Sequence, residues 1–173
     1  MGLGNPGRSY ERTHHNVGFL VTDELAKRHG GSWRAKKRAE AAPVSLNFKN
    51  VTLLKPTTFM NNSGAALAGY NAEQLVVVHD ELDLPAGVVR VKVGGGASGH
   101  NGLRSIIQHL GNDFVRVRIG VGRPPAGVTV TNYLLNSRMD PAVKEAVPLA
   151  ADAVEAVIDA GPEAAMNHFN TRA

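Results

Sequence analysis

Apolar residues recur at two different spacings in turn, and this alternation constrains the fold more than any other feature of the chain. Between residues 16 and 29 they follow the roughly 3.6-residue period of a helix, which Gly30 and Gly31 end. Residues 75–78 form a short continuous run rich in β-branched side chains, typical of a central strand covered on both faces. The chain is therefore expected to contain both helices and strands.

The remaining segments continue the alternation. We predict further strands within 38–55, with a hairpin turn at 47–50, and at 88–93 and 114–121; further helices are predicted at 101–110, at 140–160 and after Pro162. Asp140 followed by Pro141 indicates a helix start, because Asp caps free N–H groups and proline fits the first turn. Interleaved helices and strands predict an α/β fold: a single-domain three-layer sandwich with a mixed, mostly parallel central sheet flanked by helices.

Composition limits the classes of protein that remain. A chain of 173 residues with 43% hydrophobic residues fits one domain spanning residues 1–173. The absence of cysteine excludes disulfides, thiolate metal sites and a cysteine nucleophile. No stretch approaches the roughly 18 to 20 apolar residues of a membrane span, and no signal-peptide pattern is present, so we expect a cytoplasmic protein without a membrane partner. The formal charge of +4 favours an anionic partner such as nucleic acid.

Five polar segments lie in predicted turns or at predicted strand ends, where functional residues concentrate. They are Asn5, His15-Asn16, Met60-Asn61-Asn62, His79-Asp80 and His100-Asn101. Taken singly, each is explained as well by turn formation or helix capping. The glycine turn around Asn5 lacks the G-x-G-x-x-G spacing and the lysine of a phosphate-binding loop, so we do not expect nucleotide binding there.

Taken together, five segments carry a resemblance. They are GLGNPG at 2–7, HNVGF at 15–19, KPTTFMNNSG at 55–64, HDELDLP at 79–85 and GGGASGHNG at 94–102. In this order and at this spacing they resemble the bacterial peptidyl-tRNA hydrolase family, and the match covers nearly the whole chain. The turn alone is a weak signal, whereas the ordered set is highly specific.

The resemblance implies a monomeric α/β enzyme without metal or cofactor, which releases free tRNA from peptidyl-tRNA. His15 matches the family's catalytic histidine, and Asp80 matches the carboxylate that orients it. The positions matched to substrate and tRNA contacts are Asn5, Tyr10, Met60, Asn61, Asn101, Lys92 and Arg118. The asparagines are implied to hold the peptide and the water, Met60 to line the pocket, and the two basic residues to bind phosphate.

The chemistry of these residue types agrees with those roles. An imidazole can remove a proton from water near neutral pH, and a neighbouring carboxylate fixes its tautomer and stabilises the imidazolium. Charge that develops on the ester carbonyl needs a hydrogen-bond donor, for which we choose the amide of Asn61. Asparagine amides also suit a peptide backbone of any sequence, because they both donate and accept.

The chain departs from the family pattern at its start. The family's first strand precedes the Gly-Leu-Gly-Asn-Pro-Gly turn, whereas this sequence enters that turn at residue 2. We therefore expect a central strand to be missing, either because the start is misassigned or residues are omitted, or through a real deletion, which would leave a gap in the sheet and unpaired backbone groups. The segment between Met60 and Asp80 is also shorter than usual, so we expect the helix after Gly64 to end near Tyr70.

Two other functions compete with the hydrolase. One is a relative of the family that binds RNA without cleaving it, for which His15, Asp80 and the asparagines would have no use. The other is an esterase acting on small molecules. Lys92 and Arg118 favour tRNA over an uncharged ester, because phosphates give both side chains a partner.

Overall fold

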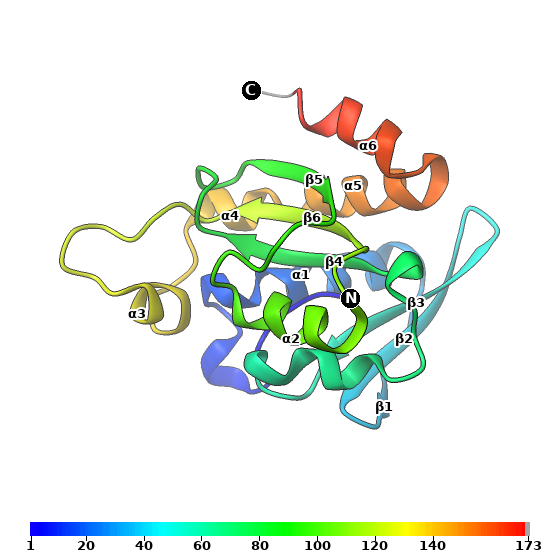
Figure 1. Ribbon diagram of the computed structural model, residues 1–173, viewed down its shortest axis with the longest axis horizontal. Helices are drawn as coiled ribbons and strands as arrows, with labels where there is room; N and C mark the ends of the chain where they lie inside the picture. The colour runs from blue at the N-terminus through cyan, green and yellow to red at the C-terminus, as the bar shows by residue number, and fades with distance from the viewer. Residues whose placement is uncertain (172–173) are drawn as a thin grey trace.

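The computed structural model describes residues 1–171 and contains two three-stranded sheets. One sheet has the order β4-β6-β5 and consists of β4 (Val76–Glu81), β6 (Val115–Gly120) and β5 (Val89–Val93). In it β4 and β6 are parallel, and β5 is antiparallel to β6. The other sheet is the antiparallel set β1 (Arg34–Lys36), β2 (Ala39–Leu46) and β3 (Lys49–Pro56). The predicted α/β class with mixed strand directions is confirmed (Figure 1).

The first three residues join the two sheets beside β4. Gly2 forms a parallel bridge with Val78. The N–H of Leu3 donates to the carbonyl of Val78 at 3.0 Å, and the N–H of Val78 donates to the carbonyl of Met1 at 2.9 Å. On the other side, the N–H of Gly2 donates to the carbonyl of Leu54 in β3 at 3.0 Å. The gap expected at this position is therefore filled over three residues, and Val78 has its backbone partners.

Helices cover both faces of the β4-β6-β5 sheet, which gives the predicted three layers. The α-helices are α1 (Val17–Arg28), α2 (Asn101–Leu110), α3 (Val130–Leu135), α4 (Pro141–Glu145), α5 (Val147–Ala160) and α6 (Pro162–Phe169). The 3-10 helices are η1 (Arg8–Tyr10), η2 (His14–Asn16), η3 (Met60–Leu67) and η4 (Ala72–Gln74). The core on one face joins the sheet to α1, α5 and α6, and the core on the other joins it to α2 and η3.

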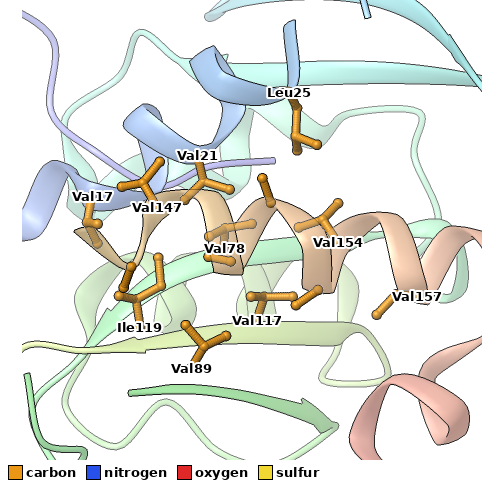
Figure 2. Packing of buried hydrophobic residues seen from close by; sticks show 14 of the residues in the cluster. Val17, Val21, Leu25, Val78, Val89, Val117, Ile119, Val147, Val154 and Val157 are labelled. Carbon is orange, nitrogen blue, oxygen red and sulfur yellow. The ribbon is translucent and has the colours of Figure 1, made fainter. Parts of the chain in front are cut away.

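Alternation along the strands supplies both cores. Val78 and Val117 point into the cluster with α1 and α5, which Figure 2 shows from close by. Val77 and Phe114 belong to the opposite cluster with α2 and η3. Successive side chains of a strand point to opposite faces, so a continuous apolar run is what a strand between two helical layers requires.

The helices of the C-terminal half differ from the sequence prediction in two ways. The helix predicted over 140–160 is divided into α4 and α5, because Pro148 has no N–H to donate to the carbonyl four residues earlier and instead occupies the first turn of α5. Asp140 is the predicted N-cap, and its side chain accepts from the N–H of Ala142 at 2.8 Å. The short helix α3 was not predicted, and it lies in a long excursion from the sheet (Figure 1). Within residues 1–171 no helix is both long and apolar enough to span a bilayer.

Candidate active site

His15 and Asp80 lie against each other, although 65 positions separate them in the sequence. Asp80 is buried near the carboxyl end of β4, and its Oδ2 atom is 2.7 Å from Nδ1 of His15 in η2. Gly18 allows this approach, because a Cβ there would lie 2.5 Å from both the backbone N of Leu3 and the carbonyl oxygen of Val78. The start of α1 therefore packs directly on the backbone of β4, and η2 brings His15 to the strand end.

A second histidine contacts the other oxygen of Asp80. Nε2 of His100 is 2.8 Å from Oδ1 of Asp80. His100 is also the N-cap of α2, where its Nδ1 atom accepts from the N–H groups of Gly102 at 3.1 Å and Leu103 at 3.3 Å. Because Nδ1 accepts, His100 donates to Asp80 through the proton on Nε2.

These contacts set the charges of the pair. Burial raises the pKa of Asp80, but the charges of His15 and His100 and their hydrogen bonds outweigh burial and hold it well below its ordinary 3.8. Burial lowers the pKa of His15, but the charge and hydrogen bond of Asp80 outweigh it and raise the pKa above 6.5. Asp80 is therefore a carboxylate near neutral pH, His15 donates to it through Nδ1, and Nε2 is the basic nitrogen.

The ligand atoms of His15, Asp80 and His100 lie within 4.8 Å of one another, close enough to suggest a metal site. The donor set does not fit a resident ion, because a metal ligand needs a free lone pair. Nδ1 of His100 already accepts two backbone N–H groups, and its Nε2 carries the proton donated to Asp80. The cluster is a hydrogen-bonded chain from the N-terminus of α2 to His15.

His79, one residue before Asp80, is a third buried histidine at the site. Its Nδ1 donates to the backbone carbonyl of Asp80 at 2.8 Å, and its ring meets that of His100 edge to face at 5.2 Å. Burial, followed by the charge of His100, lowers the pKa of His79 to about 3. His79 is therefore neutral at physiological pH and adds no charge beside the Asp80 carboxylate.

A cavity of about 350 Å³ opens beside the pair, and one wall is rich in cations. Lys92 of β5 lies opposite Arg116 of β6, and Arg118 lies opposite His79 of β4. Arg116 donates to the carbonyls of Gly95 and Gly96, both at 2.5 Å, and so fixes the glycine loop at the cavity edge. The single carboxylate near Arg118 is that of Glu81, at 3.9 Å, so among the described residues the wall keeps an excess of positive charge.

Comparison with known proteins assigns the chain to a family. The model of the family described as peptidyl-tRNA hydrolase matches residues 1–173. The chain belongs to the peptidyl-tRNA hydrolase family. The predictions that the chain belongs to this family and that it is an enzyme are thereby confirmed.

The similarity extends over whole chains. The chain is 68% identical over 173 residues to a peptidyl-tRNA hydrolase of Rubrobacter xylanophilus, covering 100% of both proteins. It is 48% identical over 166 residues to one of Rhodopseudomonas palustris, covering 92% of this chain and 81% of that protein. The crystal structure of peptidyl-tRNA hydrolase from Acinetobacter baumannii superposes with a TM-score of 0.88 at 34% identity, covering 98% of this chain and 92% of that one.

Some of the residues matched to this family's site line the cavity and others do not. His15, Asp80, Lys92, Asn101 and Arg118 line it. Asn5, Tyr10, Met60 and Asn61 are not among the described residues that do. Asn61 is exposed beside the buried Met60, and Tyr10 is half-buried at the end of η1.

Asn5 fixes the relative positions of three segments. Its backbone N–H and carbonyl pair with the side-chain amide of Asn16, at 2.8 and 2.9 Å, and its own Oδ1 accepts from the N–H of Met60 at 2.7 Å. Asn5 thereby ties the glycine turn to η2 and η3. It lines a second cavity of about 450 Å³, where its NH₂ group can donate to a ligand.

Sequence reasoning missed three features of this peptidyl-tRNA hydrolase site. His100 was noted as polar but not as a partner of Asp80, and the contact of Arg116 with the glycine loop was not expected. The apolar cavity wall from α3, which includes Leu134 and Leu135, was not expected at all. The available signal for His100 was its position between the glycine loop and the first apolar turn of a helix, where capping residues occur.

Proposed function

We propose that this chain hydrolyses the ester bond of peptidyl-tRNA, with His15 as the general base and Asp80 as the carboxylate that orients it. The observation that carries the proposal is the buried contact of 2.7 Å between His15 and Asp80 on the wall of a cation-rich cavity. Membership of the peptidyl-tRNA hydrolase family supports the same substrate.

In the proposed reaction His15 removes a proton from water through Nε2 while Nδ1 donates to Asp80. The water oxygen forms a bond to the ester carbonyl carbon, and the bond from that carbon to the ribose oxygen then breaks. The proton taken by His15 passes to the leaving ribose oxygen, which releases tRNA, and the peptide carboxylic acid that forms loses its remaining proton to solvent. Asp80 stabilises the transient imidazolium and keeps its own charge, because His100 and His15 hold its pKa far below neutral pH.

The asparagines are proposed to hold the acyl part of the substrate. Asn61 is the proposed donor to the oxyanion, and its side chain is exposed next to Met60. Asn101 opens α2 on the cavity wall, where its amide can donate to and accept from a peptide backbone. Asn5, with Oδ1 bonded to Met60, is proposed to donate through its NH₂ group to a peptide carbonyl.

Lys92 and Arg118 are proposed to bind phosphate at the end of the tRNA. Both line the cavity, and two cations on adjacent strands match the dense negative charge of a nucleic-acid terminus. An uncharged small ester would give them no partner, which argues against the esterase alternative. The RNA-binding alternative leaves the buried pair of His15 and Asp80 without a use.

The test is release of free tRNA from N-acetyl-aminoacyl-tRNA by the purified chain, with unacetylated aminoacyl-tRNA as the second substrate. The decisive variant is His15→Ala, and His29→Ala is its matched control. Nε2 of His29 also contacts a carboxylate, that of Glu155 at 2.6 Å, but this pair lies at the end of α1, outside the cavity.

We expect wild type and His29→Ala to cleave only the acetylated substrate and His15→Ala to lose cleavage while still binding tRNA. Near-normal turnover by His15→Ala would refute His15 as the base. A folded wild-type chain that binds tRNA and cleaves neither substrate would refute hydrolysis and favour the RNA-binding alternative.

A further inference from the structure

The cavity wall formed by α3 has few contacts with the rest of the protein. From Gly122 to Met139 only Leu134 is buried, yet residues of α3 line the cavity that contains His15 and Asp80. In Figure 1 this segment leaves the sheet as a long excursion and returns at α4. Segments with few buried contacts open locally at low free-energy cost. The contacts that hold α3 in place therefore determine the shape of the cavity.

His14 makes several of these contacts at once. Its side chain is only 2% exposed, and its Nδ1 lies 3.0 Å from the carbonyl oxygen of Tyr133 in α3. Its Nε2 lies 3.1 Å from the backbone N–H of Asp140, the residue that caps α4. The ring of His14 also stacks on that of Tyr133, with centroids 4.3 Å apart and planes 19° from parallel. One side chain thus contacts both α3 and Asp140, where the excursion returns to the fold.

The two partners of His14 admit only one protonation state. The backbone N–H of Asp140 can only donate, so Nε2 of His14 accepts. The carbonyl of Tyr133 can only accept, so Nδ1 carries the proton and donates. A second proton, on Nε2, would face the N–H of Asp140 and replace a hydrogen bond with a repulsive contact.

We propose that His14 is a positioning residue that holds α3 against the cavity, and that it does so only as a neutral imidazole. His14 and His15 are adjacent in η2, so the same 3-10 turn carries the proposed base and the anchor of the facing cavity wall. None of the contacts of His14 involves Asp80 or the cavity cations. His14 therefore affects the position of the α3 wall that encloses the ligand, and not the proposed base. The kinetic consequence rests on the proposed hydrolysis, whereas the structural consequence does not.

Charged groups of both signs lie around His14. Besides Tyr133 of α3 and the adjacent His15, the ionisable groups around the same groove are Glu11, Arg12, Arg138, Asp140 and Lys144. They comprise three cations and two anions, and the Asp140 carboxylate already accepts from Ala142. A proton on Nε2 would remove the hydrogen bond from the N–H of Asp140, so acidification is expected to weaken the hold on α3.

The first experiment measures amide hydrogen exchange of residues 128–139 by mass spectrometry, at about pH 8 and about pH 5.5, the range over which histidines ordinarily change charge. Protection factors, corrected for intrinsic exchange, are compared for wild type, His14→Phe and the control His29→Gln. Phe retains an aromatic ring to stack on Tyr133 but removes both hydrogen bonds. His29 is a histidine at the end of α1 and is not among the described residues that line the cavity.

In wild type we expect protection of α3 to fall by about tenfold on acidification, as the loss of hydrogen bonds of ordinary strength implies. In His14→Phe it should be low at both pH values, while His29→Gln should behave as wild type and α5 should stay protected in all three. Equal protection of α3 in wild type and His14→Phe would overturn the proposal. Wild-type protection of α3 that is independent of pH would also overturn the proposal. This comparison uses the wild-type protein alone and does not depend on whether a variant folds.

The kinetic experiment uses N-acetyl-aminoacyl-tRNA at neutral pH. We expect His14→Phe to raise KM by about threefold or more, with kcat within about twofold of wild type, because the wall is loosened and the base is intact. A fall in kcat at unchanged KM would overturn the assignment of His14 to the cavity wall. If wild type cleaves no substrate, the proposed function fails, and hydrogen exchange still decides the role of His14.

Discussion

Asp80→Asn is the substitution for which the structure makes the sharpest prediction. It exchanges one carboxylate oxygen for an NH₂ group with almost no change of volume. Its orientation is dictated by His100, whose Nδ1 accepts from Gly102 and Leu103 and whose Nε2–H must therefore donate. The amide oxygen must face His100, and the NH₂ group must face His15.

The consequence falls on the tautomer of His15. In wild type Nδ1 of His15 donates to the carboxylate, and Nε2 is left basic. Against an NH₂ group Nδ1 must accept, so the ring proton moves to Nε2 and the base is lost. The same Asp-to-Asn change in a serine-protease triad lowers kcat by about 10⁴-fold through the wrong tautomer. We expect a loss of about 10³ to 10⁴-fold in turnover here, with tRNA binding retained.

A second substitution tests the reasoning. In the double variant Asp80→Asn/His100→Phe the amide is free to turn its oxygen toward His15, so part of the lost turnover should return. The matched control is His100→Phe alone, which also loses the N-cap of α2 and so accounts for any loss of stability. Turnover is measured as single-turnover release of tRNA at saturating enzyme, with thermal unfolding as the check on folding.

Two results would refute this argument. One is an Asp80→Asn enzyme within about tenfold of wild-type turnover. The other is a folded double variant no more active than Asp80→Asn, which would mean that His100 does not control the orientation of the amide.

Three further predictions follow from the same site. Activity should fall on acidification with an apparent pKa above 6.5, because protonation removes the base and the Asp80 charge raises the pKa of His15; a midpoint below 6.5 in the profile of kcat/KM would contradict this. Lys92→Ala should raise KM and reduce the salt dependence of tRNA binding by about one counterion, measured by titration with KCl; an unchanged slope would exclude a phosphate contact. Gly18→Ala should lower the free energy of unfolding in urea by about 1 to 3 kcal/mol, because its Cβ would meet backbone at 2.5 Å; an unchanged value would show that α1 can move away from β4.

The elements that sequence reasoning identified are those whose pattern is local. The apolar run before His79 identifies β4, and the period of residues 101–110 identifies α2, because each element is covered by neighbours on predictable faces. Helix α3 was missed because it has six residues with one of them buried, too few to show a helical period. The break between α4 and α5 depends on Pro148, which fits equally well within the first turn of a new helix.

The sequence by itself determined which reactive groups the protein has, and the ordered motifs selected His15 and Asp80 from among them. Only the tertiary structure decided which atoms meet. Asp80 accepts from two histidines, His100 is locked as a donor by the helix it caps, and His14 bonds to residues about 120 positions away. The physical reason is the distance along the chain over which each effect acts. Backbone propensity and hydrophobic period act over a few residues, whereas the tautomer of an imidazole depends on partners that only the folded chain brings within about 3 Å.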